Sequence, residues 1–432
     1  MKKYCYPFLL IIFVLCITSQ SFSQLTYGWS EQNSGTTVDL WTVSAADSNV
    51  AWIGGDSLKV LRTTNGGVNW SVISGIQGLT RAIIPIYNIF AIDANNAICA
   101  GSTAANTYVY KTTNGGANWT TVFSQSGGFI DNIYMYSATN GFKNGDPVGG
   151  RFSLWKTTDG GNNWDSTGLY LPSSTGEYGV INNLFVDGSK FWMGIQGSFK
   201  DFYSTNYGSN WILQYPPDNV NCFWSNNTAS GLFMMGFYGL YITTNFGINW
   251  SLANGVPGTA YLCSLTGIGN EWWLARNELS IFYSSNNGAN WVTQYTVADK
   301  NFESLSKARS GKYIWAVRDG GKISRYGIIS GINTISQSVP SEFKLYQNYP
   351  NPFNPSTIIK FQIKDSRFVT LKVYDILGIE IATLINEKLT PGTYEVPFSI
   401  NQFSDYRIAS GVFFYVIKAG NFLETKRMIY IK

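Results

Sequence analysis

The chain of 432 residues contains no histidine. It therefore cannot use an imidazole as a general acid or base, cannot build a Ser-His-Asp triad, and lacks the commonest zinc ligand. Charged residues make up only 13% of the sequence. Residues 24–329 carry 17 Lys/Arg against 18 Asp/Glu, and residues 341–432 carry 11 against 8. Neither part has the basic stripe of a nucleic-acid-binding protein, and we expect no nucleic acid, no metal and no cofactor.

Long apolar runs are also missing, with one exception at the N-terminus. Lys2 and Lys3 precede the apolar stretch 8–17, which is followed by a small-x-small site, Ser21-Phe22-Ser23. This order is typical of a secretory signal peptide, here residues 1–23, and ten apolar residues are too few to span a bilayer. A lipoprotein signal would use Cys16, but the preceding Leu15 is large for that cleavage site. The mature chain is therefore expected to be exported without a transmembrane segment.

A short segment with the pattern [ST]-x-[DN]-x-G-x-x-W occurs six times. The Asn or Asp falls at positions 65, 114, 159, 206, 245 and 286, at intervals of 49, 45, 47, 39 and 41 residues. A period of 40–50 residues accommodates four short strands with their turns, which is one propeller blade. Gly contributes 44 residues and aromatic residues make up 16% of the chain, as expected for an all-β protein with many tight turns.

Each repeat can be divided into four short strands, as in LWTVSAAD, NVAWIGGD, KVLRTT and NWSVIS of the first. A seventh unit, KYIWAVRDGGKISRYG at 312–327, aligns without gaps on 49–64 but has no fourth strand after it. The segment YGWSEQNSG at 27–35 resembles VNWSVISGI, with Trp29 in the position of Trp70. We therefore predict a seven-bladed β-propeller over residues 24–329 whose last blade is completed by an N-terminal strand, which leaves no open join.

The repeated pattern has a structural explanation. The Asn or Asp side chain can accept hydrogen bonds from nearby backbone N–H groups, Gly takes a positive φ, and Trp begins the next strand. These residues resemble the Asp-box, or BNR, repeat, and the motif TTNGGxNW is similar to that of photosystem II assembly-factor-like propellers. The resemblance implies a structural role for Asn65, Gly67, Trp70, Asn114, Gly116, Trp119, Asp159, Gly161, Trp164, Asn206, Gly208, Trp211, Asn245, Gly247, Trp250, Asn286, Gly288 and Trp291.

Three cysteines, Cys99, Cys222 and Cys263, remain after removal of the signal peptide. Cys222 and Cys263 each lie 23 residues before the Asn of the following repeated turn. We therefore predict that they occupy the same register in successive blades, as small apolar core positions too far apart for a disulfide.

The pattern of residues in the sequence changes after residue 329. Residues 330–342 are predicted to be a linker, and 343–432 contain at least five alternating runs, which suggests a small Ig-like β-sandwich. QNYPNPFNPSTIIKF, VYDILGIEIATL and GNFLETKRMIYIK resemble the type A C-terminal sorting domain of type IX secretion. The resemblance implies recognition by the secretion machinery and a location in the medium or on the outer cell surface. Its sorting motif corresponds to Pro350, Asn351, Pro352, Phe353 and Pro355.

A ligand is expected on the propeller face opposite the repeated turns, where the loops between second and third strands and between blades lie. The candidate residues are Asp56, Arg81, Asp146, Arg151, Glu177, Tyr178, Tyr238, Arg276, Glu278, Arg318 and Asp319. Arg276 and Arg318 share one register, each three residues after a Trp.

Three functions remain open: a non-catalytic surface propeller that binds an extracellular protein or glycan, an exported Asp-box glycosidase, and a structural surface or matrix protein with no dedicated ligand. The Arg-Ile-Pro type motif of sialidases is absent before the first repeat, and no catalytic residue is assigned. Arg81, Arg276 and Arg318 gathered around a carboxylate-sized pocket would favour the enzyme, and a broad aromatic or mixed-charge face would favour binding.

Overall fold

The computed structural model describes residues 26–73, 76, 85–227, 231–236, 239–253, 255–258, 260–330, 333–336, 338–354, 356–399 and 410–431. The predicted signal peptide lies outside these residues. Their secondary structure is β-strands with two short 3-10 turns, η1 (Asp56–Leu58) and η2 (Asp319–Gly321). Within these ranges no helix has the length and apolar character needed to cross a membrane.

The described strands between residues 26 and 330 form seven antiparallel sheets. In chain order they comprise β2 (Leu40–Ala45), β3 (Ala51–Gly55), β4 (Val60–Thr63) and β5 (Ser71–Ile73); β6 (Asn88–Ala91), β7 (Ala97–Ser102), β8 (Asn106–Thr112) and β9 (Thr120–Ser126); β10 (Ile130–Met135), β11 (Gly141–Val148) and β12 (Arg151–Thr157); β13 (Tyr178–Asp187), β14 (Lys190–Gln196), β15 (Asp201–Ser204) and β16 (Ile212–Gln214); β17 (Val220–Asn227), β18 (Gly231–Gly236), β19 (Leu240–Thr243) and β20 (Ser251–Leu252); β21 (Leu262–Ile268), β22 (Glu271–Arg276), β23 (Ser280–Ser284) and β24 (Val292–Thr296); and β25 (Phe302–Lys307), β26 (Ile314–Arg318), β27 (Lys322–Ser330) and β1 (Thr26–Asn33).

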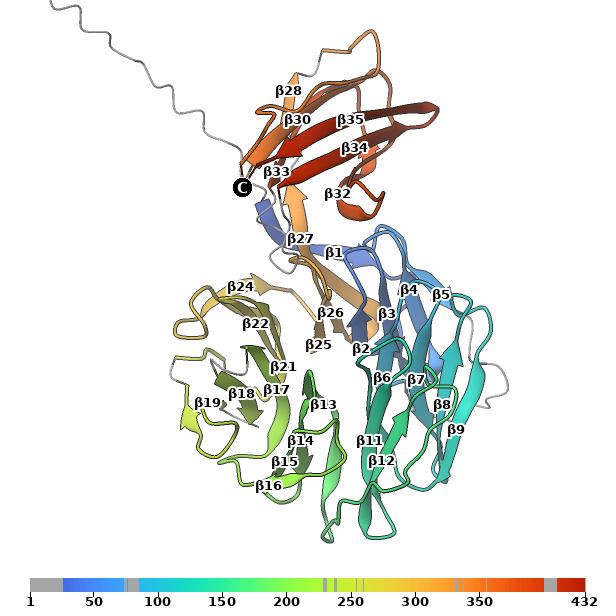
Figure 1. Cartoon of the computed structure of the whole chain (residues 1–432), viewed down its shortest axis with the longest axis vertical. Coiled ribbons are helices and arrows are strands. Elements are labelled where there is room, and N and C mark those ends of the chain that lie inside the picture. Colours follow the sequence, from blue (N-terminus) through green and yellow to red (C-terminus); the bar gives the residue numbers. More distant parts are fainter. Residues whose placement is uncertain are drawn as a thin grey trace, which may run out of the picture.

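The seven sheets are arranged in a ring (Figure 1). Their first strands contact one another in a closed cycle, β2, β6, β10, β13, β17, β21, β25 and back to β2. The second strands β3 and β7 are buried along their whole length, because each is covered by neighbouring sheets on both faces. The outermost strands β5 and β20 are mainly exposed. This is the architecture of a β-propeller, as the sequence predicted.

The N-terminal strand completes the last sheet. β1 pairs with β27 in antiparallel register, with Trp29 opposite Tyr326 and Ser30 opposite Arg325. In the first sheet Ser71 lies opposite Arg62, so Trp29 occupies the position that Trp70 holds there. The predicted pairing is therefore confirmed in its register.

Side chains of β1 also reach both neighbouring sheets. The Trp29 indole stacks on Tyr295 at 5.4 Å and donates to Gln294 Oε1 at 2.9 Å. Glu31 accepts hydrogen bonds from Arg318 and from Ser324. On the other side, Gln32 donates to the backbone carbonyl of Gly66 in the first turn at 3.0 Å. The strand thus links the last sheet to the sheets before and after it.

Two sequence expectations about the propeller need correction. The third sheet has three strands, and its fourth strand is reduced to two isolated bridges, Lys156 with Asp165 and Arg151 with Pro172. The two cysteines differ in register by one residue, because Val220 and Leu262 are the equivalent first pairing positions and each is followed by a bulge. Cys263 lies at that bulge and is partly buried, whereas Cys222 lies one position further and is buried; both thiols are free.

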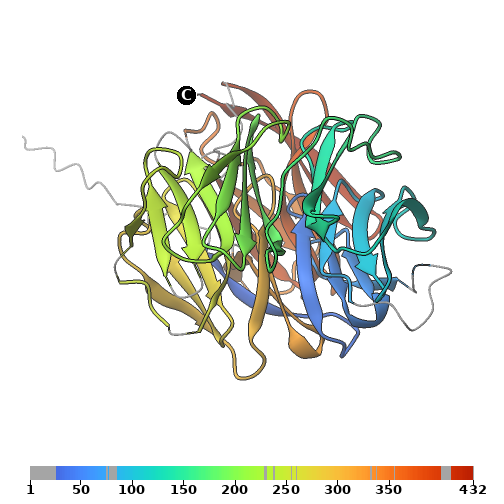
Figure 2. The same cartoon turned by 90° about the horizontal axis from the view of Figure 1, so that it is seen from below.

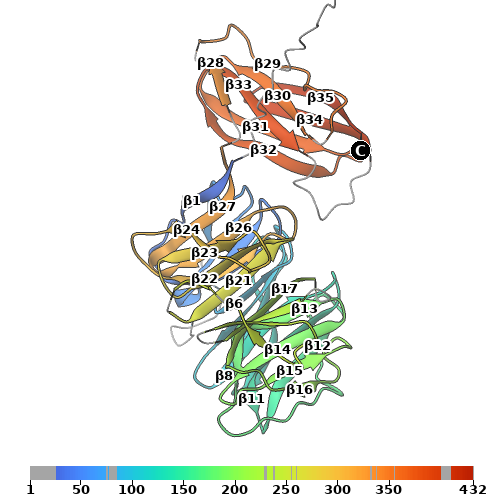
Figure 3. The same ribbon diagram turned by 90° about the vertical axis from the view of Figure 1, so that its left-hand side faces the viewer.

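The C-terminal part is a sandwich of two four-stranded sheets (Figure 3). Their strand orders are β28-β33-β30-β29 and β32-β31-β34-β35. The bounds are β28 (Asn333–Ser336), β29 (Lys344–Leu345), β30 (Ser356–Ile363), β31 (Arg367–Tyr374), β32 (Glu380–Leu389), β33 (Gly392–Ser399), β34 (Gly411–Ala419) and β35 (Phe422–Tyr430). Phe361 and Val396 from one sheet share a single core with Leu371 and Tyr415 from the other.

The predicted linker 330–342 differs from the structure. Its residues 333–336 form β28, which pairs with β33 at the edge of the sandwich. Only two positions separate the end of β27 from the start of β28. In Figure 2, the sandwich lies behind the propeller sheets. The propeller is therefore joined to the sandwich directly from the sheet that β1 completes.

Removing β1 from the mature chain is expected to destabilise the fold. Arg318 is 1% exposed, whereas its partner Glu31 is 49% exposed and Asp299 also contacts the guanidinium. Loss of Glu31 should therefore cost less than the value of about 3–5 kcal/mol that is typical of a fully buried ion pair. We expect calorimetry to show a lower Tm for the protein lacking 26–33 and a smaller decrease for Glu31→Gln. Glu342→Gln, which changes an exposed ion pair with Lys344, should leave Tm unaltered. A Tm unchanged by the deletion would contradict closure by β1.

Candidate functional site

The six repeated turns share one hydrogen-bond pattern. In the first turn, Thr63 Oγ1 accepts from Gly67 N at 2.8 Å, and Asn65 Oδ1 accepts from Asn69 N at 3.0 Å. The same two bonds recur in the turns containing Asn114, Asp159, Asn206, Asn245 and Asn286. The conserved side-chain chemistry of these turns is thus directed at their own backbone, which leaves it little capacity for a ligand.

The glycine of the turn is fixed by conformation and by space. Gly116 has a φ of 87°, a conformation that disfavours residues with a Cβ. A Cβ there would also lie 2.5 Å from Ile73 of the preceding sheet. The tryptophans of the turns also pack on the preceding sheet. The ring centroids of Trp119 and Trp52 lie 6.1 Å apart, and those of Trp211 and Phe142 lie 5.9 Å apart. Each turn is therefore part of the contact between consecutive sheets.

A basic residue before the turn strengthens this contact in the first three repeats. Arg62 donates to the Gly115 carbonyl at 3.1 Å, and Lys111 donates to the Gly160 carbonyl at 2.7 Å. Lys156 donates to Ser209 Oγ in the same way. Each cation thus reaches the turn of the next repeat, a role that was visible in the sequence only as the R or K before TT.

Two of the arginines predicted on the ligand face, Arg276 and Arg318, are used inside the protein. Arg276 is 3% exposed and donates to the carbonyls of Pro257 and Ala260. Arg318 donates to the Asp299 carbonyl at 2.8 Å and to Glu31. Neither guanidinium is presented to a carboxylate ligand. Arg81 and Tyr238 lie outside the described residues.

The acidic residue Glu177 is also occupied. Its side chain is nearly fully buried and forms an ion pair with Lys200 at 2.6 Å. Burial alone would raise the pKa of Glu177, but hydrogen bonds from Lys200, Ser174 and Ser198 lower it overall. Asp146 accepts a hydrogen bond from the backbone of Gly179, and burial raises its pKa. These two groups fix the connection into β13.

Two predicted residues, Asp56 and Asp319, are brought together with Asp39 and Glu303. Burial raises the pKa of Asp319, and the charges of Asp39 and Asp56 raise it further. Burial likewise raises the pKa of Glu303 to about 7, opposed by a hydrogen bond from Asn277. Asp56 Oδ1 accepts from the Trp41 indole at 2.7 Å. This group of four carboxyl groups on the predicted face is called the acidic cluster below.

Aromatic rings lie beside the acidic cluster. Trp41 contacts Tyr87 at 5.3 Å, and Tyr87 contacts Phe129 at 6.0 Å. Trp41 and Glu303 both lie at the bulge near the start of a first strand. Glu303 was missed from the sequence because that bulge shifts the inward-facing register of the strand; aligning the first strands on their opening pair would have revealed it.

The remaining candidates lie separately. Arg151 and Tyr178 are exposed at the starts of β12 and β13. Glu278 is partly buried and close enough to Arg276 to stabilise its charge. In the described ranges there is no group of three Cys, Asp or Glu arranged to hold a metal ion.

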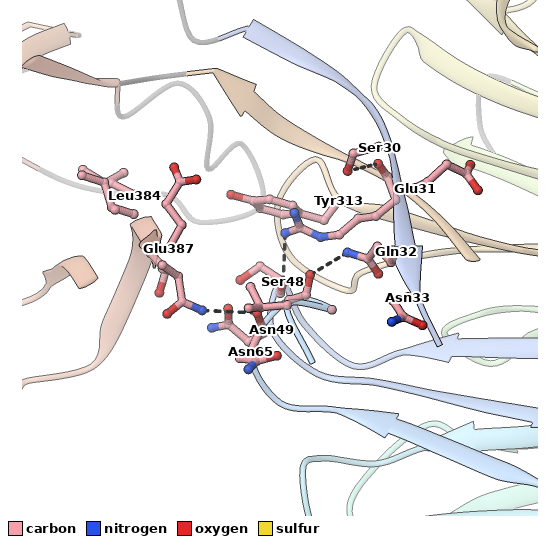
Figure 4. Close-up of a pocket in the computed structure, with 17 residues that line it drawn as sticks. Ser30, Glu31, Gln32, Asn33, Ser48, Asn49, Asn65, Tyr313, Leu384 and Glu387 are labelled. Carbon is pink, nitrogen blue, oxygen red and sulfur yellow. Dashed lines mark hydrogen bonds between the residues drawn. The ribbon is translucent and has the colours of Figure 1, made fainter. Parts of the chain in front are cut away.

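A polar cleft of about 560 Å³ separates the propeller from the sandwich (Figure 4). β1, the first turn and Arg325 form one wall, and residues 383–387 of β32 form the other. Asn386 donates to the Asn65 carbonyl at 3.2 Å across the boundary. The edge strand β32 therefore rests against the first repeated turn.

The predicted sorting motif is built into the sandwich. Phe353 is 2% exposed and packs on Phe398 and Tyr430. Asn351 Oδ1 accepts from Ile429 N at 2.9 Å, and Phe353 N donates to the carbonyl of the same residue. The Tyr349–Pro350 and Asn351–Pro352 bonds are cis. The motif thus binds along the last strand, β35; Pro355 lies outside the described residues.

Residues 347–432 match the family model of the secretion system C-terminal sorting domain. The C-terminal sandwich therefore carries a type IX secretion signal, which implies export to the cell surface or release from the cell. The motif residues that contact β35 all fall inside the matched range. The search of curated proteins finds no match to this chain.

Solved structures resemble the chain at low sequence identity. "YCF48 bound to D1 peptide" matches with a TM-score of 0.57 and 17% identity, over 69% of this chain and 96% of that one. YCF48 from Cyanidioschyzon merolae matches with 0.57 and 15%, over 69% and 98%. PorZ, a surface component of the type-IX secretion system of Porphyromonas gingivalis, gives 0.48 and 13%, over 91% and 59%. At these identities the YCF48 likeness establishes the propeller fold alone.

Stability is expected to fall as pH rises, because of Asp201. Both of its carboxyl oxygens are buried without a hydrogen-bond partner, and burial raises its pKa to about 8 from 3.8. The folded state therefore binds this proton more tightly than the unfolded chain, and the resulting stability is complete below pH 4 and lost as pH rises to 8. Asp201→Asn should raise Tm at pH 8.5, on the order of 5 °C.

The comparison requires Tm at pH 5 and pH 8.5 for both proteins. Asp165→Asn, a change at an exposed carboxylate, serves as the control and should retain the pH dependence of the parent. Equal slopes for the parent and Asp201→Asn would show that Asp201 is ionised or paired in the folded protein.

Proposed function

We propose that this protein is a non-catalytic, seven-bladed propeller that binds an extracellular protein or glycan, after export directed by its sorting domain. Each of the seven sheets then represents one blade, and the repeated turns are Asp-box turns with a structural role. The signal peptide supplies the first step of export across the inner membrane. The ligand face is the side that carries the acidic cluster.

The observation that carries the proposal is that the predicted arginines of this face are bonded inside the protein. Arg276 and Arg318 donate their hydrogen bonds to backbone carbonyls and, for Arg318, to Glu31. This pairing argues against a glycosidase site that binds a substrate carboxylate. What remains accessible is a broad mixed surface with Tyr178, 57% exposed, and Tyr261, 38% exposed. Mixed aromatic and charged surfaces of this kind suit recognition of a macromolecule.

One observation favours the alternative, an exported glycosidase. Glycosidases use two carboxyl groups whose environments separate their pKa values. Glu303, with a pKa of about 7, lies close enough to Asp319 for their charges to interact and could remain protonated at neutral pH as a general acid. If this protein hydrolyses glycosides, Glu303 is the residue most suited to protonate the leaving group.

Binding and turnover can be separated in one screen. The mature chain should bind a glycan array or an extracellular protein while leaving fluorogenic aryl glycosides, sialosides included, intact. Asp56→Asn with Asp319→Asn should weaken binding about tenfold, whereas Asp165→Asn should have no effect. Aryl glycoside turnover that is abolished by Glu303→Gln would instead establish the glycosidase.

Export should depend on the sandwich and not on the propeller. A chain ending at Ser330 keeps all seven sheets, because none of the described strands of the sandwich pairs with them. In a type IX host we expect this chain to fold and accumulate in the periplasm, while the full chain reaches the surface or medium. Phe353→Ala should reproduce the defect, and Phe368→Ala, at a 47% exposed position, should not. Normal export of the truncated chain would contradict the assignment.

A further inference from the structure

A second hollow lies on the opposite face of the ring, the face of the repeated turns. Its volume is about 550 Å³, within the range of about 300–1,000 Å³ usual for ligand sites. It is formed by the ends of β6, β10 and β13, the fourth repeated turn, and the connection between β25 and β26. The side chains that the argument uses are Phe90, Tyr134, Tyr136, Tyr207, Ser137 and Arg309. We call it the tyrosine hollow.

Aromatic rings make up its walls. Tyr136 and Tyr207 contact each other with ring centroids 5.0 Å apart, and Phe90 and Tyr134 contact each other at 5.3 Å. Tyr136 is further supported from behind by Phe191 at 6.0 Å. Tyr207 is 43% exposed. The hollow therefore presents tyrosine rings that are held in position yet accessible.

Tyr207 occupies an unfavourable backbone position. The residue after the Asn or Asp of each turn is left-handed, and the first three turns fill it with Gly66, Gly115 and Gly160. Tyr207 has a φ of 57°, a conformation that is strained for a bulky residue and not for glycine. Phe246, the equivalent residue of the next turn, stacks on Tyr203. Tyr207 packs in a similar way on Tyr136 and Phe191 and remains 43% exposed. Its left-handed position thus holds an accessible aromatic ring, and this ring lines the hollow.

Arg309 supplies hydrogen-bond donors at the rim. It extends from the last sheet to the second, where it donates to the carbonyls of Ile92 and Ala91 and lies 4.9 Å over the Phe90 ring. Two of its five N–H groups are used in these bonds, and the residue is exposed. Asp47 and Asp93 lie close enough to stabilise its charge. The remaining Arg309 donors therefore border the aromatic walls, together with Ser137, whose oxygen accepts from the backbone of Thr139 and Asn140 and whose O–H can donate.

We propose that the tyrosine hollow binds a saccharide, with a pyranose ring stacked on Tyr207 and Tyr136 and its hydroxyl groups at Arg309 and Ser137. The C–H face of a sugar ring is apolar and packs on an aromatic face, while its hydroxyls both donate and accept hydrogen bonds. An apolar peptide side chain would match the rings but leave the polar rim unpaired, which is costly. This site lies on the face opposite the acidic cluster and so goes beyond the proposed function.

The test uses the full mature chain and an array of neutral and uronic-acid oligosaccharides, followed by saturation-transfer NMR with the best binder. Tyr207→Gly restores the residue of the first three turns and should keep or raise Tm while weakening binding at least tenfold. Asn287→Gly makes the same backbone change in the sixth turn, away from the hollow, and should bind like the parent. Arg309→Ala should also weaken binding.

Saturation of the protein's aromatic protons should transfer to the C–H protons of the bound saccharide, and this transfer should fall in Tyr207→Gly. The double change at Asp56 and Asp319 should leave saccharide binding intact, so this site is distinguished from the other face. Failure of every saccharide to bind the parent overturns the proposal, as does equal binding by the parent and Tyr207→Gly. Peptide binding at the hollow without saccharide binding would also overturn it.

Discussion

The pairing of β1 with β27 is the constraint on which the ring depends. A propeller resists opening when the two ends of its chain meet in one sheet, and here β1 pairs with β27, with Asn33 opposite Lys322. Glu31 accepts a hydrogen bond from Arg318 of the same sheet, while Trp29 and Gln32 contact the sheets on either side. One strand thus provides the last ladder of the ring and contacts to both neighbours.

The rim is held by a different device, the repeated turn. Each turn satisfies its own backbone through one Asn or Asp and one Ser or Thr, and the cation before it in repeats one to three bonds to the next turn. Because the polar groups of each turn are paired within the turn, its other positions can hold different side chains without disrupting it. Tyr207 illustrates this: the turn is preserved, and only its left-handed residue departs from glycine.

Much of this architecture follows from the sequence. The period of the turns predicted the ring of sheets. The likeness of 27–35 to a fourth strand predicted the register of Trp29. The sorting domain was evident because its residues form contiguous motifs. Phe353 and Asn351 act locally against β35, so short-range pattern was sufficient.

The site was less predictable, because it depends on how residues from separate sheets are oriented. Arg276 and Arg318 share a register, as predicted, but that register points into the interior, where backbone carbonyls take their N–H groups. Glu303 was hidden by a bulge that shifts a strand by one residue, and the same kind of offset separates Cys222 from Cys263. The loss of the fourth strand in the third repeat and the strand at 333–336 depend on pairing with distant partners.

Native-state hydrogen exchange tests closure by β1 most directly. If the ring is closed by this strand, the amides of β1 that pair with β27 will exchange only with the global opening that also releases β25 and β26. Rapid exchange of the β1 amides, while β25 and β26 remain protected, would show that the strand is peripheral and that the ring is held without it.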